Sequence, residues 1–311
     1  MEGAIRLRTV NIRESERSDI APENRRDQVN EYVLCAWHEL PLWQQDNEWI
    51  YSGYRPVSGS LVTSLKSLGY IHNETVNIYS HLLGALFFAT APFHAYRAIY
   101  PQYPSTTPAD LFVFSTFFFG VALCFLLSAT FHIISNHSQR VAEFGNQLDY
   151  LGVVLLMWGS TIPTVYYGFY CDPRLQKLYW TMISALAIAC AVTTLNPRFR
   201  RPELRPYRAA MYTGLGLSAM IFIVHGIMKY GWSMQNQRMS LSWMGLMTAF
   251  NLVGAVTYAA RVPERWHPRK YDNWGSSHQV LHISVILAAV AHMIGLFRAF
   301  DFLHTHGVIC D

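Results

Sequence analysis

Two histidines, His278 and His282, lie four residues apart at the start of an apolar run, in the stretch "WGSSHQVLHISVILAAVAHMIGL". On an α-helix, side chains at positions i and i+4 share a face, with Cβ atoms roughly 5–6 Å apart. Two imidazoles at this spacing can bind one zinc ion, which takes nitrogen and sulfur ligands in a tetrahedral arrangement. The pair therefore indicates a metal site, provided that another element supplies a further ligand.

The elements that must position this pair are membrane-spanning helices. Only 14% of the 311 residues are charged and 51% are apolar, against about 25% charged residues in ordinary soluble proteins. A bilayer core is spanned by about 20 apolar residues. Seven runs qualify: 76–99, 111–134, 148–170, 179–195, 209–228, 240–260 and 280–298. Because the connections are short, successive helices are expected to be antiparallel neighbours, and the predicted fold is an all-α, seven-transmembrane helix bundle.

The lysines and arginines near the helix ends predict the orientation of the bundle. Eleven lie on the side shared with the N-terminus and six on the other, and cytosolic loops carry such an excess. We therefore expect a cytosolic N-terminus and a C-terminus outside, the reverse of a G-protein-coupled receptor. Cytosolic loops facing anionic lipid explain the net charge of +4, and no nucleic-acid partner is expected.

Four regions are expected along the chain. Residues 1–30 are expected to form a disordered cytosolic tail, and residues 31–75 a cytosolic juxtamembrane segment. Residues 76–300 are expected to form the seven-helix transmembrane domain, and residues 301–311 a short extracellular or lumenal tail. The first region is polar with few aromatics, and it lacks the apolar core of a cleavable signal peptide.

The juxtamembrane segment is expected to contain an interfacial helix. The stretch "SLVTSLKSLGYI" spaces Leu61, Leu65 and Leu68 as an amphipathic helix on a membrane surface would. A surface for a cytosolic partner is equally compatible with this pattern. Two glycosylation sequons, at 73–75 and 136–138, fall on the expected cytosolic side and are expected to be unmodified.

With this orientation, polar residues from three spans meet near the cytosolic face. The second span ends "LLSATFHII", with His132 near its end and Ser128 one turn earlier on the same face. The third begins "NQLDYLGVV", which places Asp149 in its first turn. Ionisable residues at this depth are costly and usually face the bundle interior. The expected metal ligands are His132, His278 and His282, with the fourth position open to water as in catalytic zinc sites.

The general base must come from outside the histidine pair. No glutamate lies between the two histidines, unlike the H-E-x-x-H motif of metalloproteases. Asp149 is the carboxylate expected at this depth and can orient or deprotonate the water, while Ser128 can hydrogen-bond the site or a substrate carbonyl. The alternative for each histidine alone is a hydrogen-bonded core residue. His81 is expected to make a helix–helix hydrogen bond rather than to bind metal.

Several segments together resemble the progestin and adipoQ receptor family. They cover nearly all of the chain from about residue 32 to 300, in order, as "DNEWIYSGYRP" (46–56), "NETVNIYSHLLGALFF" (73–88), "LLSATFHIISNHS" (126–138), "LDYLGVVLLMWGSTIPTVYYGFYC" (148–171) and "RVPERWHPRKYDNWGSSHQVLH" (261–282). The likeness is to the adiponectin receptors and their fungal zinc-homeostasis and osmotin-receptor relatives. This branch is related to haemolysin III and the alkaline ceramidases.

The resemblance implies a zinc ion (Zn2+) bound by His132, His278 and His282, with Asp149 and Ser128 beside it. It implies a ceramidase-like hydrolase that cleaves a membrane lipid amide such as ceramide and releases a free fatty acid. Two alternatives stay open. One is a receptor for an extracellular protein ligand, with structural zinc and output through cytosolic partners, and the other is a regulator of metal-ion homeostasis. The expected location is the plasma membrane or the endoplasmic reticulum.

The chain has five cysteines. Only Cys171 and Cys310 are expected outside the cytosol, where an oxidising compartment permits a disulfide. Sequence alone supplies no distance between them, so their pairing stays open at this point.

Overall fold

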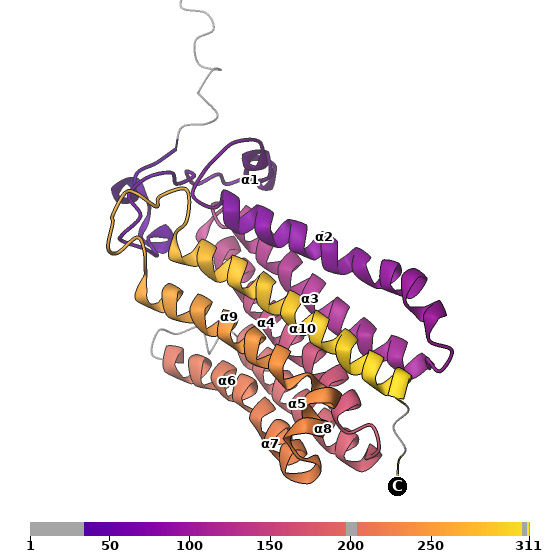
Figure 1. Ribbon diagram of the computed structural model, residues 1–311. Coiled ribbons are helices and arrows are strands. Elements are labelled where there is room, and N and C mark those ends of the chain that lie inside the picture. The colour runs from indigo at the N-terminus through magenta and orange to yellow at the C-terminus, as the bar shows by residue number, and fades with distance from the viewer. Residues whose placement is uncertain (1–33, 197–203, 307–309, 311) are drawn as a thin grey trace, which may run out of the picture. The chain divides into compact units, whose positions relative to one another are not determined.

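The computed structural model describes residues 34–196, 204–306 and 310. Within these residues the fold is helical, and extended backbone pairs only in one isolated bridge, between Cys35 and Tyr54. Seven helical segments in this part of the chain are long and apolar enough to cross a membrane (Figure 1). The predicted class, an all-α chain with seven candidate membrane spans, is confirmed. The tail expected at 1–30 lies outside the described residues.

The seven spans follow one another along the chain. They are formed by α2 (Thr75–Ala98), α3 (Pro108–Ile134), α4 (Gln139–Gly168), α5 (Pro173–Leu195), the pair α6 (Arg205–Leu217) and α7 (Ala219–Tyr230), α9 (Leu241–Ala260) and α10 (Ser277–His306). Two short helices, α1 (Leu61–Lys66) and α8 (Trp232–Met239), complete the α-helices of the described residues. Short 3-10 turns occupy Trp37–Glu39, Leu42–Gln44, Ser67–Gly69 and Tyr100–Gln102.

Two helices extend well beyond the apolar runs that predicted them. The fourth helix begins at Gln139 rather than near residue 148, and α10 continues through His306 rather than ending near residue 300. Residues 301–306, expected to belong to a tail, therefore continue the last helix. Leu303 is buried there, and the Tyr103 hydroxyl donates to Asp301 at 2.7 Å. A predicted span ends at the first polar residues, because it is defined by a run of apolar ones. A helix can continue past them as long as its backbone hydrogen bonds are made and one of its faces is packed against the protein.

Glycines allow α3 and α4 to approach closely. A Cβ atom at Gly152 would lie 2.9 Å from the Cα atom of Cys124, and one at Gly159 would lie 2.5 Å from the carbonyl oxygen of Thr116. In a membrane, where burial of apolar surface drives little association, such small-residue contacts let helix backbones pack. The backbone contact fixes the register in which the polar residues of α3 and α4 face one another.

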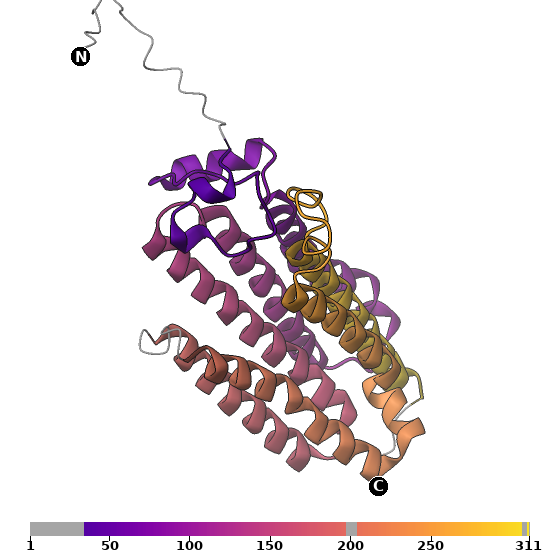
Figure 2. The ribbon, with the colours of Figure 1, turned by 90° about the vertical axis from the view of Figure 1, so that its left-hand side faces the viewer.

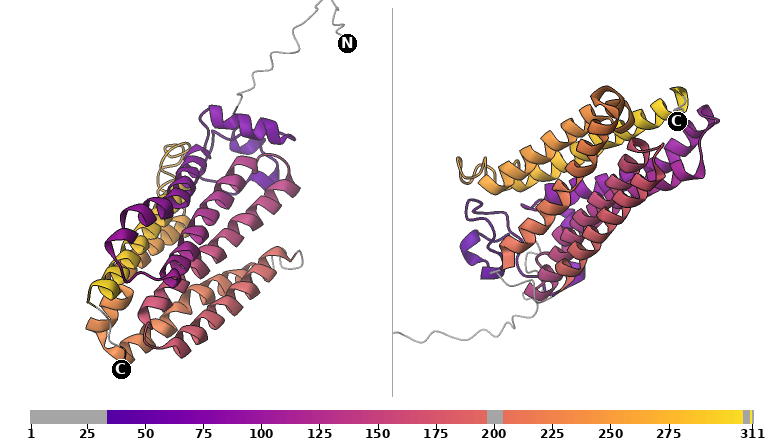
Figure 3. Two further views of the ribbon diagram at one scale, coloured as in Figure 1. Left: turned by 90° about the vertical axis from the view of Figure 1, so that its right-hand side faces the viewer. Right: turned by 90° about the horizontal axis from the view of Figure 1, so that it is seen from below.

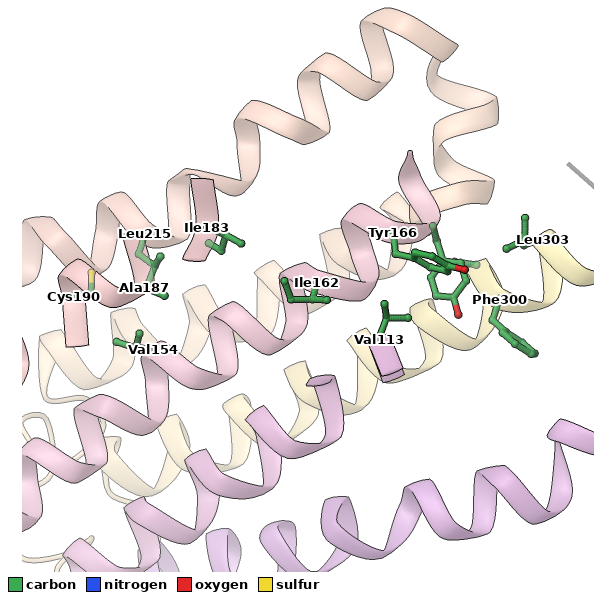
Figure 4. Close-up of a cluster of buried hydrophobic side chains, with 12 residues drawn as sticks. Val113, Val154, Ile162, Tyr166, Ile183, Ala187, Cys190, Leu215, Phe300 and Leu303 are labelled. Carbon is green, nitrogen blue, oxygen red and sulfur yellow. The ribbon is translucent and has the colours of Figure 1, made fainter. Parts of the chain in front are cut away.

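Apolar packing ties the remaining spans to this pair. One cluster of buried residues joins α3, α4, α5, α6 and α10, and Figure 4 shows its side chains arranged along α4, including Val113, Ile162, Tyr166, Ile183 and Phe300. A second cluster, rich in phenylalanine, joins α2, α3 and α10. The two clusters hold α10 against α3, which brings histidines far apart in the sequence to one place.

One end of the bundle is covered by two segments distant in sequence. Residues 34–74 and the 261–276 connection lie at the same end, at which α2 and α10 begin (Figures 2 and 3). The carboxylate of Asp272 accepts hydrogen bonds from the Tyr51 backbone N–H at 3.1 Å and the Ser52 hydroxyl at 2.6 Å. We call these two segments the terminal cap.

The helix α1, which lies in the terminal cap, buries polar side chains and exposes apolar ones. Its Ser64 side chain is buried and donates to Asn136 at 2.8 Å, and the following Ser67 is also buried. Leu61 and Leu65 are instead exposed, by 53% and 52%. A helix is therefore present at the stretch expected to be interfacial, with its apolar face turned away from the protein.

The opposite end of the bundle contains a disulfide. Cys171, just after α4, is bonded to Cys310, and their Cα atoms are 5.2 Å apart. The pairing that the sequence left open is therefore present. Both sequon asparagines, Asn73 and Asn136, lie at the other end and are buried, so neither side chain is accessible to a glycan in the folded chain.

Candidate metal centre

Three histidines converge at the capped end of the bundle. His132 lies in the last turn of α3, and His278 and His282 lie in the first two turns of α10. Each offers a ring nitrogen, and these nitrogens all lie within 4.8 Å of one another. The ring centroids are separated by 4.8, 4.9 and 5.0 Å. The imidazoles thus form a nearly equilateral triangle.

The histidine triangle fits a zinc ion in its chemistry. The Nε2 atom of His132 is buried and has no hydrogen-bond partner among the described residues. Leaving such an atom unpaired costs about 1–3 kcal/mol, and coordination to a metal removes that cost. Zinc binds imidazole nitrogen at about 2.0–2.1 Å, so the ring nitrogens would have to move closer together than their present separations of up to 4.8 Å. Three imidazoles are a donor set that suits zinc.

A hydroxyl and a carboxylate lie next to the triangle. Ser128 is buried one turn before His132, and its side chain interacts with the carboxylate of Asp149 on α4. The Asp149 carboxylate also interacts electrostatically with His132. It is not a member of the three-residue ligand group. The structure therefore brings together all five predicted site residues, with the carboxylate beside the ligands rather than among them.

Glu74, at the N-terminus of α2, is a neighbour that the sequence analysis missed. Its Oε2 atom lies 2.7 Å from Nδ1 of His132 and accepts a second hydrogen bond, also 2.7 Å, from the Asn77 side chain. The Oε2 atom of Glu74 is therefore held between two side chains, one of which is a metal-ligand candidate.

The second helix contributes a further residue, His81. Its ring stacks on that of His282, with centroids 3.7 Å apart and an interplanar angle of 20°, and it also contacts Phe125 at 4.7 Å. The described contacts of His81 are thus ring packing against a metal-ligand candidate rather than the expected helix–helix hydrogen bond. His81 is not a member of the ligand group, as expected.

A buried glutamate fixes the start of α10. Glu264 is fully buried and accepts hydrogen bonds from the Ser277 backbone N–H at 2.8 Å, from the Ser277 hydroxyl and from Asn47 at 3.0 Å. A carboxylate at a helix N-terminus satisfies unpaired N–H groups and complements the helix dipole. Because His278 directly follows Ser277, the hydrogen bonds that Glu264 accepts fix the helix turn that carries the histidine pair.

A buried arginine of the terminal cap holds the end of α3. The guanidinium of Arg55 donates to four oxygens, those of the His132 carbonyl at 2.6 Å, the Ser67 hydroxyl at 2.7 Å, the Ile133 carbonyl at 3.0 Å and the Ser135 hydroxyl at 3.1 Å. The last carbonyls of a helix have no partner within the helix. Arg55 supplies one, and it therefore fixes the backbone of the turn that carries His132.

The terminal cap also anchors the backbone of Glu74. Burial and the positive charge of Arg55 lower the pKa of His72 to about 4, so this imidazole is neutral at pH 7. Its Nδ1 atom accepts the backbone N–H of Glu74 at 3.1 Å. The side chain of Gln279, between the histidines of α10, donates to the carbonyl of Asn73 at 3.2 Å. The start of α2 is thus tied to α10.

Comparison with known proteins assigns this arrangement to a family. The model of the family described as Haemolysin-III related matches residues 69–293. The chain belongs to this family. It is 39% identical to the ADIPOR-like receptor IZH2 of Saccharomyces cerevisiae over 87% of this chain and 85% of that protein. It is 40% identical to Progestin and adipoQ receptor-like protein 1 of Caenorhabditis elegans over 85% of this chain and 60% of that protein.

A plant relative agrees with the architecture. The chain is 31% identical to the Heptahelical transmembrane protein ADIPOR1 of Oryza sativa subsp. japonica over 83% of this chain and 82% of that protein. The resemblance to the progestin and adipoQ receptor family is confirmed by these relatives. The chain is an adiponectin-receptor-like, integral multi-pass membrane protein.

Proposed function

We propose that this protein is a zinc-dependent lipid amide hydrolase of the ceramidase type. The observation that carries the proposal is the triangle of His132, His278 and His282 with the interacting pair Ser128 and Asp149 beside it. Three protein ligands with an unligated carboxylate nearby is the arrangement of hydrolytic zinc sites, whereas structural sites close with four protein ligands. When bound, zinc lowers the pKa of a water towards about 7 and polarises a carbonyl.

The side chains of the chain itself supply the proton transfers. The Asp149 carboxylate accepts a proton from the attacking water and delivers it to the nitrogen of the departing amine. The Asp149 carboxylate interacts with both Ser128 and His132, which places it beside the proposed ligands. The two products are a free fatty acid and a long-chain amine.

A lipid substrate suits the surroundings of the site. The terminal cap covers the end of the bundle above the histidines, through contacts such as those of Arg55 and Glu264, so a substrate would enter sideways from the bilayer. An amide bond lies near the headgroup boundary of a lipid such as ceramide. Its acyl chains would then lie along the apolar walls of the spans.

The orientation of the chain is part of the same proposal. We place the N-terminus and the terminal cap in the cytosol and the C-terminus outside or in the lumen of the endoplasmic reticulum. The excess of lysine and arginine on the N-terminal side supports this orientation. The Cys171–Cys310 disulfide at the opposite end also supports it, because disulfides persist in oxidising compartments.

A receptor function is the second candidate, and the names of the relatives favour it. The yeast relative is named an ADIPOR-like receptor, and a protein ligand for the present chain would bind the face opposite the terminal cap. In that case zinc is structural and the output passes through cytosolic partners.

Fatty-acid release from a short-chain ceramide by purified protein tests the proposal. Activity that disappears on metal removal and returns with added zinc supports the hydrolase. No release above the metal-stripped control across several ceramides would favour the receptor.

A further inference from the structure

The first two turns of α2 present three polar residues to the histidine triangle. Glu74, Asn77 and His81 are spaced three and four residues apart, so they share one face of the helix. Glu74 contacts His132, and His81 stacks on His282. A fourth helix therefore contacts the site in addition to those that carry Asp149 and the ligand candidates.

The Glu74 carboxylate does not serve the usual purpose of an acidic residue at a helix start. It occupies the N-cap position of α2, yet its side chain accepts no hydrogen bond from the backbone of that helix. Its Oε2 atom accepts from His132 and Asn77 instead. The backbone of Glu74 is anchored separately by His72. Contacts of both its side chain and its backbone thus hold Glu74 with its carboxylate against His132.

This contact decides which nitrogen of His132 is available to a metal. A neutral imidazole has one N–H donor and one acceptor nitrogen, and Oε2 of Glu74 already accepts a hydrogen bond from the Asn77 side chain. A hydrogen on Nδ1 completes the 2.7 Å contact with Glu74 and leaves the lone pair on Nε2. That atom is the buried nitrogen without a partner.

We propose that Glu74 is a positioning residue that fixes His132 as an Nε2 ligand of the zinc ion, with Asn77 orienting its carboxylate. Carboxylates behind ligating histidines set the tautomer and ring orientation and raise the basicity of the ligand. The inference rests on the zinc site of the proposed function and adds to it a residue on α2.

Zinc affinity in matched variants of the full chain tests this role. Glu74→Ala removes the acceptor, whereas Glu74→Gln keeps an oxygen that accepts the same N–H. Glu48→Ala is the control, because Glu48 is exposed in the terminal cap. Affinity is measured by competition with a chromophoric chelator, and geometry by the visible absorption of the cobalt-substituted protein. Unfolding midpoints of the metal-free proteins identify variants that are merely unstable.

The expected zinc affinity of Glu74→Ala is about 10–100-fold below that of wild type, with an altered cobalt spectrum. Glu74→Gln should recover most of the affinity and the wild-type spectrum, and Glu48→Ala should match wild type. Wild-type affinity and spectrum in Glu74→Ala would overturn the inference. A loss in Glu74→Gln as large as that in Glu74→Ala would also overturn it.

The outcomes separate this inference from the proposed function. If the wild type binds zinc but cleaves no lipid amide, the hydrolase proposal fails, and the affinities of the Glu74 variants still decide the inference. If Glu74→Ala binds zinc as wild type does while wild type cleaves ceramide, the inference fails and the hydrolase stands. Wild type without zinc affinity would overturn both.

Discussion

Ser128 on α3 and Asp149 on α4 interact beside the three converging histidines. The two helices approach at glycines, one of which, Gly152, lies about one turn after Asp149. The position of the carboxylate is therefore set by backbone packing and by a neighbouring hydroxyl. In the proposed reaction this arrangement keeps Asp149 off the metal and free to accept a proton.

Loss of the histidine pair should abolish metal binding. His278→Ala combined with His282→Ala leaves one imidazole, which is too few to hold zinc in a tetrahedral site. We expect about one zinc per chain in purified wild type and almost none in the double variant, measured by elemental analysis. The matched control combines His94→Ala with His306→Ala, both exposed, and should keep its zinc. Equal zinc in the two double variants would show that the triangle is not the metal site.

The close contact of α3 and α4 should be sensitive to a single methyl group. Gly159→Ala places a Cβ atom 2.5 Å from the Thr116 carbonyl oxygen, and overpacking of this kind costs about 1–3 kcal/mol. We expect a lower midpoint of thermal unfolding in detergent. Gly245→Ala on α9 meets nothing within 4 Å, so it should leave the midpoint unchanged or raise it slightly. Similar midpoints for both variants would mean that α3 and α4 are further apart than described.

The arginine that holds the end of α3 should not be replaceable by lysine. Arg55 reaches four acceptors at once, whereas a lysine ammonium is a compact point charge without the planar fork of arginine. Arg55→Lys leaves buried carbonyls unpaired, at about 1–3 kcal/mol each, and should lower the unfolding midpoint and weaken zinc binding through His132. Arg140→Lys, at an exposed position of α4, is the control. An unaltered midpoint in Arg55→Lys would argue that the terminal cap is not needed to hold α3.

The proposed orientation predicts which parts of the chain are accessible from outside. In sealed cells, an N-terminal tag should resist added protease and a C-terminal tag should be cleaved. After treatment with an impermeant reductant, Cys171 and Cys310 should react with an impermeant maleimide, whereas Cys35 in the terminal cap should react only after the membrane is permeabilised. Labelling of Cys35 in intact cells would reverse the orientation.

The sequence predicts the spans because a run of about twenty apolar residues without charges is long enough to cross the hydrocarbon core of a bilayer. It predicts the histidine pair because a spacing of four places both rings on one face of a helix. His132 and Asp149 are predicted from depth, because the apolar runs place both near the side on which the second span ends and the third begins. The first-turn position expected for Asp149 is wrong, since α4 begins at Gln139 and Asp149 lies ten residues further along the helix. These predictions depend on periodicity and on counting along helices.

The sequence analysis missed Glu74, although the same argument from depth in the membrane applies to it. The first span begins on the side where the second ends, so a carboxylate at residue 74 lies at the level of His132. The stretch is used in the sequence analysis only as a glycosylation sequon and as part of a segment that resembles the family, without a role for the carboxylate. Arg55 and Glu264 could not be found in this way, because their roles depend on how loops fold over the bundle end. Loop geometry leaves no periodic pattern in the sequence.

The rate of ceramide cleavage during zinc reconstitution, compared between wild type and Asp149→Asn, tests the central claim most directly. Both proteins keep the three histidines, so both should take up about one zinc per chain. Wild-type cleavage should rise with bound zinc, and Asp149→Asn should remain roughly 10²- to 10⁴-fold slower at full occupancy, because it lacks the general base. A wild type that fills with zinc and releases no fatty acid, or an Asp149→Asn variant that cleaves as fast as wild type, would contradict the account.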